Sequence, residues 1–153
     1  MKTLAQDDTT AEILQRLHAL DPARPARWGK MSAPQMVRHL IDSAGVAFGE
    51  VAVSDASSVL QRTIIQWIAL YAPMPWPPEI KTRPEIDQVL GHGSAPGDFS
   101  ADVAELAAMT QRLAAHPVGA PWSRHPIFGA MSHAEWLRWA DLHTDHHLRQ
   151  FGA

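Results

Sequence analysis

The sequence predicts an all-α protein, an antiparallel four-helix bundle whose helices are joined by long loops rich in Pro and Gly. Apolar residues recur at helical spacing in four long segments and one short one, and no segment alternates as a strand does. Each of three helix starts carries a capping box, in which Ser or Thr stands three residues before Glu or Gln. The length of 153 residues suits a single domain that spans residues 1–153.

A short helix is expected over residues 9–20, where Thr9 and Glu12 form the first capping box. Asp21 and Pro22 end this helix, and a linker follows. The helix is shorter than the four that form the predicted bundle.

The second helix is expected over residues 33–48, opened by the capping box of Ser32 with Gln35 and stopped by Gly49. Its apolar residues follow the helical period, and His39 lies on the flank of the apolar face. We therefore expect His39 to be at least half buried.

The third helix is expected over residues 57–71, where the β-branched residues leave some room for a strand but the length of the apolar segment favours a helix. The bundle would bury its apolar stripe, which consists of Val59, Leu60, Ile64, Ile65, Ile68 and Ala69. Residues 72–97 are rich in Pro and Gly and predict a long loop, with room for a short helical turn near residues 84–90.

Residues 100–115 and 132–151 complete the pattern, the last helix beginning at the third capping box. With Trp136 at 0° and 100° per residue, His143 falls at about 340° and His147 at about 20°, within the apolar stripe. Four residues of helix rise about 6 Å, so the two imidazole rings can converge on a single atom.

Composition excludes several classes of protein. The formal net charge of −3 provides no basic face for a nucleic acid, so we expect no such partner. The chain has no Cys, so a metal site would depend on imidazole and oxygen ligands. The sequence shows no signal peptide and no apolar run of about 20 residues, which predicts a cytoplasmic protein without membrane contact.

His39, His143 and His147 are the candidate metal ligands, because bundles build such sites from side chains of facing helices. A pair of His four residues apart is weak by itself, since nine His in 153 residues give about half such a pair by chance. Their place on a buried stripe adds weight, because a buried imidazole needs polar partners. Ordinary core histidines, bonded to hydroxyls, carbonyls or water, are an equally supported interpretation.

Other candidates carry less weight. Residues 143–147 do not match the His-Glu-x-x-His pattern of zinc proteases, because the Glu is missing. Gln150 and His146 are candidates for orienting a ligand ring or a bound water, although packing on the helix flank is the stronger interpretation of His146. His125, in the loop before the last helix, is the candidate for a substrate contact. The glycine-rich segment 91–97 lacks the Lys of a phosphate loop and is interpreted as a flexible loop.

Three strings of the sequence resemble a DinB-like branch of the DinB/YfiT superfamily, and the likeness spans nearly the whole chain. The strings are Trp28-Gly29-Lys30-Met31-Ser32 running into Gln35-Met36-Val37-Arg38-His39-Leu40, then His125-Pro126-Ile127-Phe128-Gly129, and then Met131-Ser132 with Trp136 and His143 through Gly152. The resemblance implies a four-helix bundle in which His39, His143 and His147 bind a divalent metal. The superfamily's usual His-Arg-Gly-Gln ending reads His147-Leu148-Arg149-Gln150 here, which departs between the His and the Gln.

The resemblance also implies an enzyme that acts on a small-molecule substrate. That substrate would be a low-molecular-weight thiol if the enzyme is an S-transferase, and the enzyme would be a hydrolase if water occupied the site instead. An ion held by three imidazoles lowers the pKa of a bound thiol or water. Zn²⁺ or Ni²⁺ suits such ligands best, and Mn²⁺ or Fe²⁺ less well. A homodimer is implied too, and the proline-rich segment 73–84 of this sequence offers Trp76 as an exposed anchor. The alternative is a non-catalytic metal-binding or stress-response interaction module, because no nucleophile motif is present.

Overall fold

The computed structural model of the chain describes residues 1–78, 80 and 82–153, and its regular structure within these ranges is entirely helical. The all-α prediction is confirmed. The elements in order are α1 (Asp7–His18), α2 (Ala33–Phe48), the π-helical turn η1 (Gln61–Ile65) that continues into α3 (Gln66–Tyr71), the 3₁₀ turn η2 (Pro84–Ile86), α4 (Phe99–Ala114) and α5 (His133–Gln150). The predicted loop 72–97 includes residues 79 and 81, which lie outside the described residues.

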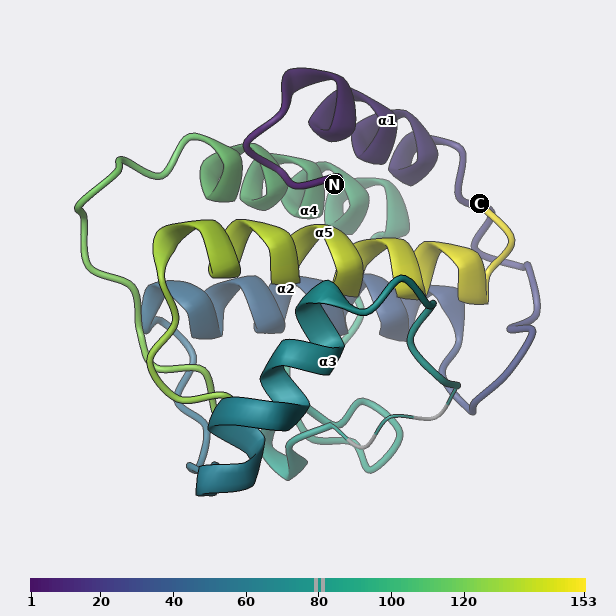
Figure 1. Ribbon diagram of the computed structural model, residues 1–153. Coiled ribbons are helices and arrows are strands. Elements are labelled where there is room, and N and C mark those ends of the chain that lie inside the picture. Colours follow the sequence, from purple (N-terminus) through teal and green to yellow (C-terminus); the bar gives the residue numbers. More distant parts are fainter. Residues whose placement is uncertain (79, 81) are drawn as a thin grey trace.

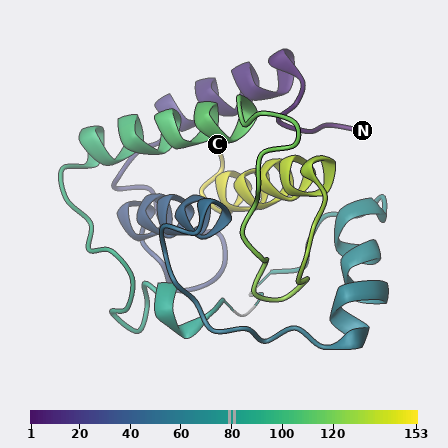
Figure 2. The same cartoon turned by 90° about the vertical axis from the view of Figure 1, so that its left-hand side faces the viewer.

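Four helices, α1, α2, α4 and α5, pack around one core, and α3 lies outside them (Figures 1 and 2). Helix α2 runs along α4, while α5 contacts α1, α2, α3 and α4. Most of the largest fully buried side chains come from α1, α2, α5 and the residue that follows α5. They are Trp136, Phe151, Leu4, Ile13, Leu17, Met36, Leu70, Leu137, Leu148 and Val37. None of the helices in the described ranges has the length and hydrophobicity of a membrane span.

Two of the three predicted capping boxes form. The Oγ atom of Ser32 accepts a bond from the Gln35 amide, and Gln35 Oε1 accepts one from the Ser32 amide, at the start of α2. Ser132 and Glu135 make the same pair of bonds at the start of α5. These caps satisfy amides that the first helical turn leaves without partners, so each helix begins at a defined residue.

The predicted box of Thr9 with Glu12 is wrong. Helix α1 begins at Asp7, and no side chain caps it through a hydrogen bond. Asp7 and Asp8 in the first turn favour this earlier start, because acidic residues there interact well with the helix dipole.

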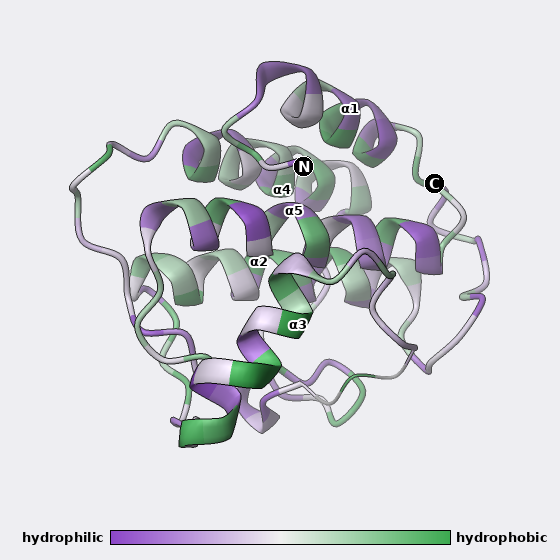
Figure 3. Cartoon of the chain, viewed as in Figure 1, coloured by the Kyte–Doolittle hydropathy of each residue, from purple (hydrophilic) through white to green (hydrophobic). Residues whose placement is uncertain are grey.

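The third predicted helix differs most from the expectation. Five of the six residues of its apolar stripe are exposed to solvent, Ala69 is partly buried, and only Gln66 and Leu70 of the segment are buried. Figure 3 shows hydrophobic turns of η1 and α3 at the outside of the molecule. The spacing of apolar residues predicts a helix with one apolar face, but it does not say what covers that face.

Candidate metal centre

Three histidine rings from two helices meet in the interior between α2 and α5. His39 comes from α2, and His143 and His147 stand one turn apart on α5. Each offers one ligand atom, and the three atoms lie within 4.8 Å of one another. The ring centroids are 4.8 to 5.2 Å apart. We call these three residues the histidine cluster.

Packing of the two helices explains this convergence. The α2 residues around His39 are buried almost without exception, and α5 presents the stripe that contains Trp136, Ala140 and Thr144 to the same core. His39 is 4% exposed and His147 8%, while His143 is partly buried. The prediction that His39 is at least half buried is confirmed.

Hydrogen bonds fix the proton on the outer nitrogen of two rings. His39 Nδ1 lies 3.3 Å from the carbonyl oxygen of Ile86, which can only accept. His147 Nδ1 lies 2.8 Å from Gln150 Oε1, and the Gln150 amide nitrogen donates to the Trp28 carbonyl at 2.7 Å. Both rings therefore carry the proton on Nδ1 and have a free lone pair on Nε2, which is the form that binds metal.

One distance between ligand atoms suits a metal ion. The Nε2 atoms of His39 and His143 lie 3.3 Å apart. Two nitrogen ligands of one tetrahedral zinc ion, with bonds of about 2.0–2.1 Å, are separated by about 3.3 Å. The donor set of three imidazoles fits a divalent ion of the zinc or nickel type.

Burial keeps the cluster neutral. It lowers the pKa of His39, and it lowers the pKa values of His143 and His147 well below the ordinary value for histidine. The neighbouring rings lower the pKa of His143 further, because two protonated imidazoles at this distance repel each other. Neutral imidazoles near pH 7 are ready to bind metal without first losing protons.

Aromatic rings surround the cluster. Trp139 stacks on His143 with 4.6 Å between centroids, and Trp76 lies 6.1 Å from both His143 and His146. The Trp76 Nε1 atom donates to the Ala69 carbonyl of α3 at 2.7 Å. Trp76 is therefore partly buried beside the histidine cluster, and the prediction of an exposed anchor is wrong.

His146 lies beside the cluster but not in it. It is 4% exposed, its ring centroid is 5.2 Å from that of His147, and it packs against Trp28 at 5.5 Å. Its Nδ1 atom has no hydrogen-bond partner within the described residues. This placement agrees with the interpretation of His146 as a residue that packs on the helix flank.

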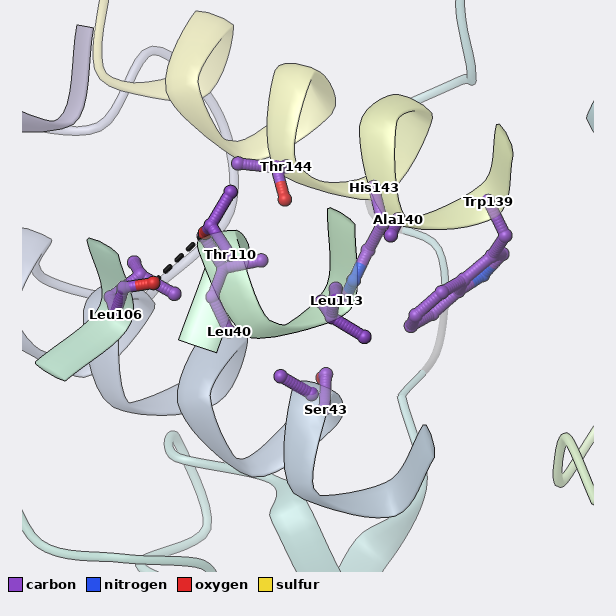
Figure 4. A pocket seen from close by; sticks show the side chains of 10 residues that line it. Leu40, Ser43, Leu106, Thr110, Leu113, Trp139, Ala140, His143 and Thr144 are labelled. Atoms are coloured by element: carbon purple, nitrogen blue, oxygen red, sulfur yellow. Dashed lines mark hydrogen bonds between the residues drawn. The ribbon is translucent and has the colours of Figure 1, made fainter. Parts of the chain in front are cut away.

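A small cavity borders the cluster on the side of α4. It measures about 10 Å³ and lies beside His143 and Trp139, with the hydroxyl groups of Ser43, Thr110 and Thr144 in its wall (Figure 4). A water molecule needs about 10–15 Å³ of this space. The cavity therefore has room for no more than one water.

Two supporting contacts could not be read from the sequence. Gly29 has φ 76°, and a Cβ atom there would lie 2.9 Å from the Gln150 amide nitrogen, so glycine lets the chain approach Gln150 closely. The buried carboxylate of Asp42 accepts bonds from the Ser94 amide, the Ser94 hydroxyl and the Gln88 amide. These bonds hold the glycine-rich loop, which we interpreted as flexible, against α2.

The predicted substrate residue His125 is buried, with 4% exposure. Its Nδ1 atom accepts bonds from the amides of Ile127 and Phe128, and its ring stacks on Phe128. Only Nε2 is left for any other partner. Burial lowers the pKa of His125 to about 3.

This pKa predicts acid sensitivity. Unfolded His125 binds a proton below about pH 6.5 and folded His125 does not, so its contribution to stability is lost as the pH falls from 6.5 toward 3. Between pH 7 and pH 5 the loss amounts to about 2 kcal/mol of unfolding free energy. Denaturant unfolding at both pH values, with chelator present, should show a smaller loss in His125→Asn than in wild type. Equal losses in the two proteins would contradict the assignment.

Comparison with known protein families gives one match. Residues 2–153 match the family described as "Protein of unknown function (DUF1569)". No curated protein and no solved structure matches the chain. The description of this family assigns no activity to its members.

Proposed function

The chain belongs to the DUF1569 family, and we propose that it is a metal-dependent enzyme whose His39, His143 and His147 hold one divalent ion. The observation that carries the proposal is the 3.3 Å separation of two Nε2 atoms within a cluster of three neutral imidazoles. Zn²⁺ or Ni²⁺ is the proposed metal, ahead of Mn²⁺ or Fe²⁺, because the ligand set has imidazoles and no carboxylate. The resemblance of its strings to the DinB/YfiT superfamily supports an antiparallel four-helix bundle and the same three ligands.

The proposed reaction is transfer of a low-molecular-weight thiol, with hydrolysis as the other member of the class. The ion would lower the pKa of a bound thiol or water, so that the anion is present near neutral pH. In the transfer, a sulfur–carbon bond to the electrophile forms while the leaving group departs with its electron pair. The three histidines would bind the ion. The Ile86 carbonyl and Gln150 orient the rings of His39 and His147, and the rings of Trp76 and Trp139 exclude water from the cluster.

The test is turnover of a thiol with a model electrophile by the zinc- or nickel-loaded protein. We expect product formation that a chelator abolishes and that His39→Ala lowers at least 100-fold, while His92→Ala, an exposed histidine, leaves it unchanged. An activated ester without thiol tests hydrolysis in the same way. If the chelator lowers neither the thiol transfer nor the ester hydrolysis, the enzymatic proposal is contradicted.

A non-catalytic metal-binding module is the second candidate. Burial of the rings favours it, since His39 is 4% exposed and the adjoining cavity has a volume of only about 10 Å³. Structural metal sites are closed, whereas catalytic ones keep a position open. Stoichiometric metal without any chelator-sensitive turnover would support this candidate over the enzyme.

A further inference from the structure

The segment from residue 59 to residue 71 turns an apolar face to solvent. Five of its side chains recur at the i, i+4, i+7, i+8 and i+11 spacing of a single helical face, and they are Leu60, Ile64, Trp67, Ile68 and Tyr71. Val59 and Ile65 flank them, and all seven side chains are 40 to 80% exposed. We call these seven residues the outer apolar face. Figure 2 shows α3 at the edge of the molecule, on the far side of α5 from α2.

The exposed area is large for a monomer. Seven side chains of about 150 Å² each, roughly half exposed, present on the order of 600 Å². The largest apolar patch of a typical monomer covers about 300–600 Å² and is itself often functional. Two such faces in contact would bury about 1,200 Å², which reaches the range of specific interfaces.

Charge limits what can cover this face. Arg62 is the sole charged residue between positions 58 and 74. Its guanidinium already donates to the Ser57 hydroxyl and pairs with Asp55 at 3.7 Å. Within residues 58–74, all of which the structure describes, no unpaired charge is left to match an acidic or basic partner. A membrane-surface helix would carry unpaired Lys or Arg beside its apolar face, which this segment lacks.

We propose that the outer apolar face binds a second copy of this chain, helix against helix about a two-fold axis. A symmetric contact places each apolar side chain against the equivalent face of the other copy, so the interface needs no complementary charge. The proposal does not depend on metal binding. The interface would lie partly on α3. The Ala69 carbonyl of α3 accepts a hydrogen bond from Trp76, whose ring lies beside the histidine cluster.

Sedimentation velocity tests the pairing. We expect wild type to have twice the mass of one chain at micromolar concentration, and Ile64→Lys/Ile68→Lys to be a folded monomer. Because the contact would bury two unpaired charges per copy, the dissociation constant should rise more than about 100-fold. Val118→Lys is the matched control, since Val118 is 87% exposed outside the face. A monomeric wild type, or a dimer that survives the double substitution, overturns the proposal.

Cross-linking tests the symmetry. The chain has no Cys, so single cysteines at Ile64, Trp67 or Ile68 can be oxidised without side reactions. At least one should form a disulfide with itself between two copies, because residues near a two-fold axis meet their own equivalents. Val118→Cys should not. A wild-type monomer that binds neutral or anionic phospholipid vesicles would instead assign the face to a membrane and refute the dimer.

Discussion

Removal of both α5 histidines should abolish the binding of divalent metal. In His143→Ala/His147→Ala only one of three imidazoles remains, and one imidazole does not hold an ion against water. Substitution of residues that merely support ligands costs 10–100-fold in affinity, so the loss of two ligands should exceed about 100-fold. Metal content after gel filtration and titration calorimetry with Zn²⁺ and Ni²⁺ measure the effect.

The matched control is His18→Ala/His92→Ala, which removes two exposed histidines and leaves the cluster intact. It should retain one equivalent of metal per chain. Far-ultraviolet circular dichroism establishes that both double variants are folded. Equimolar metal in the His143→Ala/His147→Ala protein would exclude the histidine cluster as the site.

Replacement of Gln150 by Leu should lower metal affinity 10–100-fold without removing a ligand. Gln150 Oε1 accepts the Nδ1 proton of His147, and its amide nitrogen is itself held by the Trp28 carbonyl. Leucine has a similar size but no acceptor, so the ring would be free to change its tautomer or rotate. Competition titrations with a zinc indicator give the dissociation constant.

Gln111→Leu is the control for this substitution, because Gln111 is an exposed glutamine of α4. Its affinity should equal that of wild type. Far-ultraviolet circular dichroism separates orientation from simple damage, since a folded Gln150→Leu protein with lowered affinity has lost only the hydrogen bond that positions His147. An unchanged dissociation constant in Gln150→Leu would mean that this hydrogen bond does not support the site.

The sequence predicts much of the cluster because local rules govern its parts. The boxes at Ser32 and Ser132 set the starts of α2 and α5, and the helical period then fixes which side chains face inward. His143 and His147 share one stripe for that reason. Their approach to His39 depends on how two helices pack, which periodicity alone leaves open.

Contacts between distant segments could not be predicted. The bond from Gln150 to the Trp28 carbonyl joins positions 122 residues apart, and Asp42 meets Ser94 across 52 residues. Residues with no chemical motif of their own make these contacts. Gly29 and Gly93 were the available signals, because a Cβ atom would lie 2.9 Å from the Gln150 amide nitrogen at the first and 2.7 Å from the Asp42 carboxylate at the second.

The apolar stripe of the third predicted helix shows a case in which the helix was predicted correctly and its burial was not. Its pattern is correct for a helix with one apolar face, yet residues such as Ile64 and Ile68 are 57% and 43% exposed. A sequence encodes which residues avoid water, and the partner that removes them from water can be another chain.

The most direct test of the metal centre is anomalous scattering from a crystal of the metal-loaded protein, measured on both sides of the zinc absorption edge. We predict one strong peak about 2.0–2.1 Å from a ring nitrogen of each of His39, His143 and His147. A fully loaded protein with its peak elsewhere, or with no density between these three rings, would contradict the account.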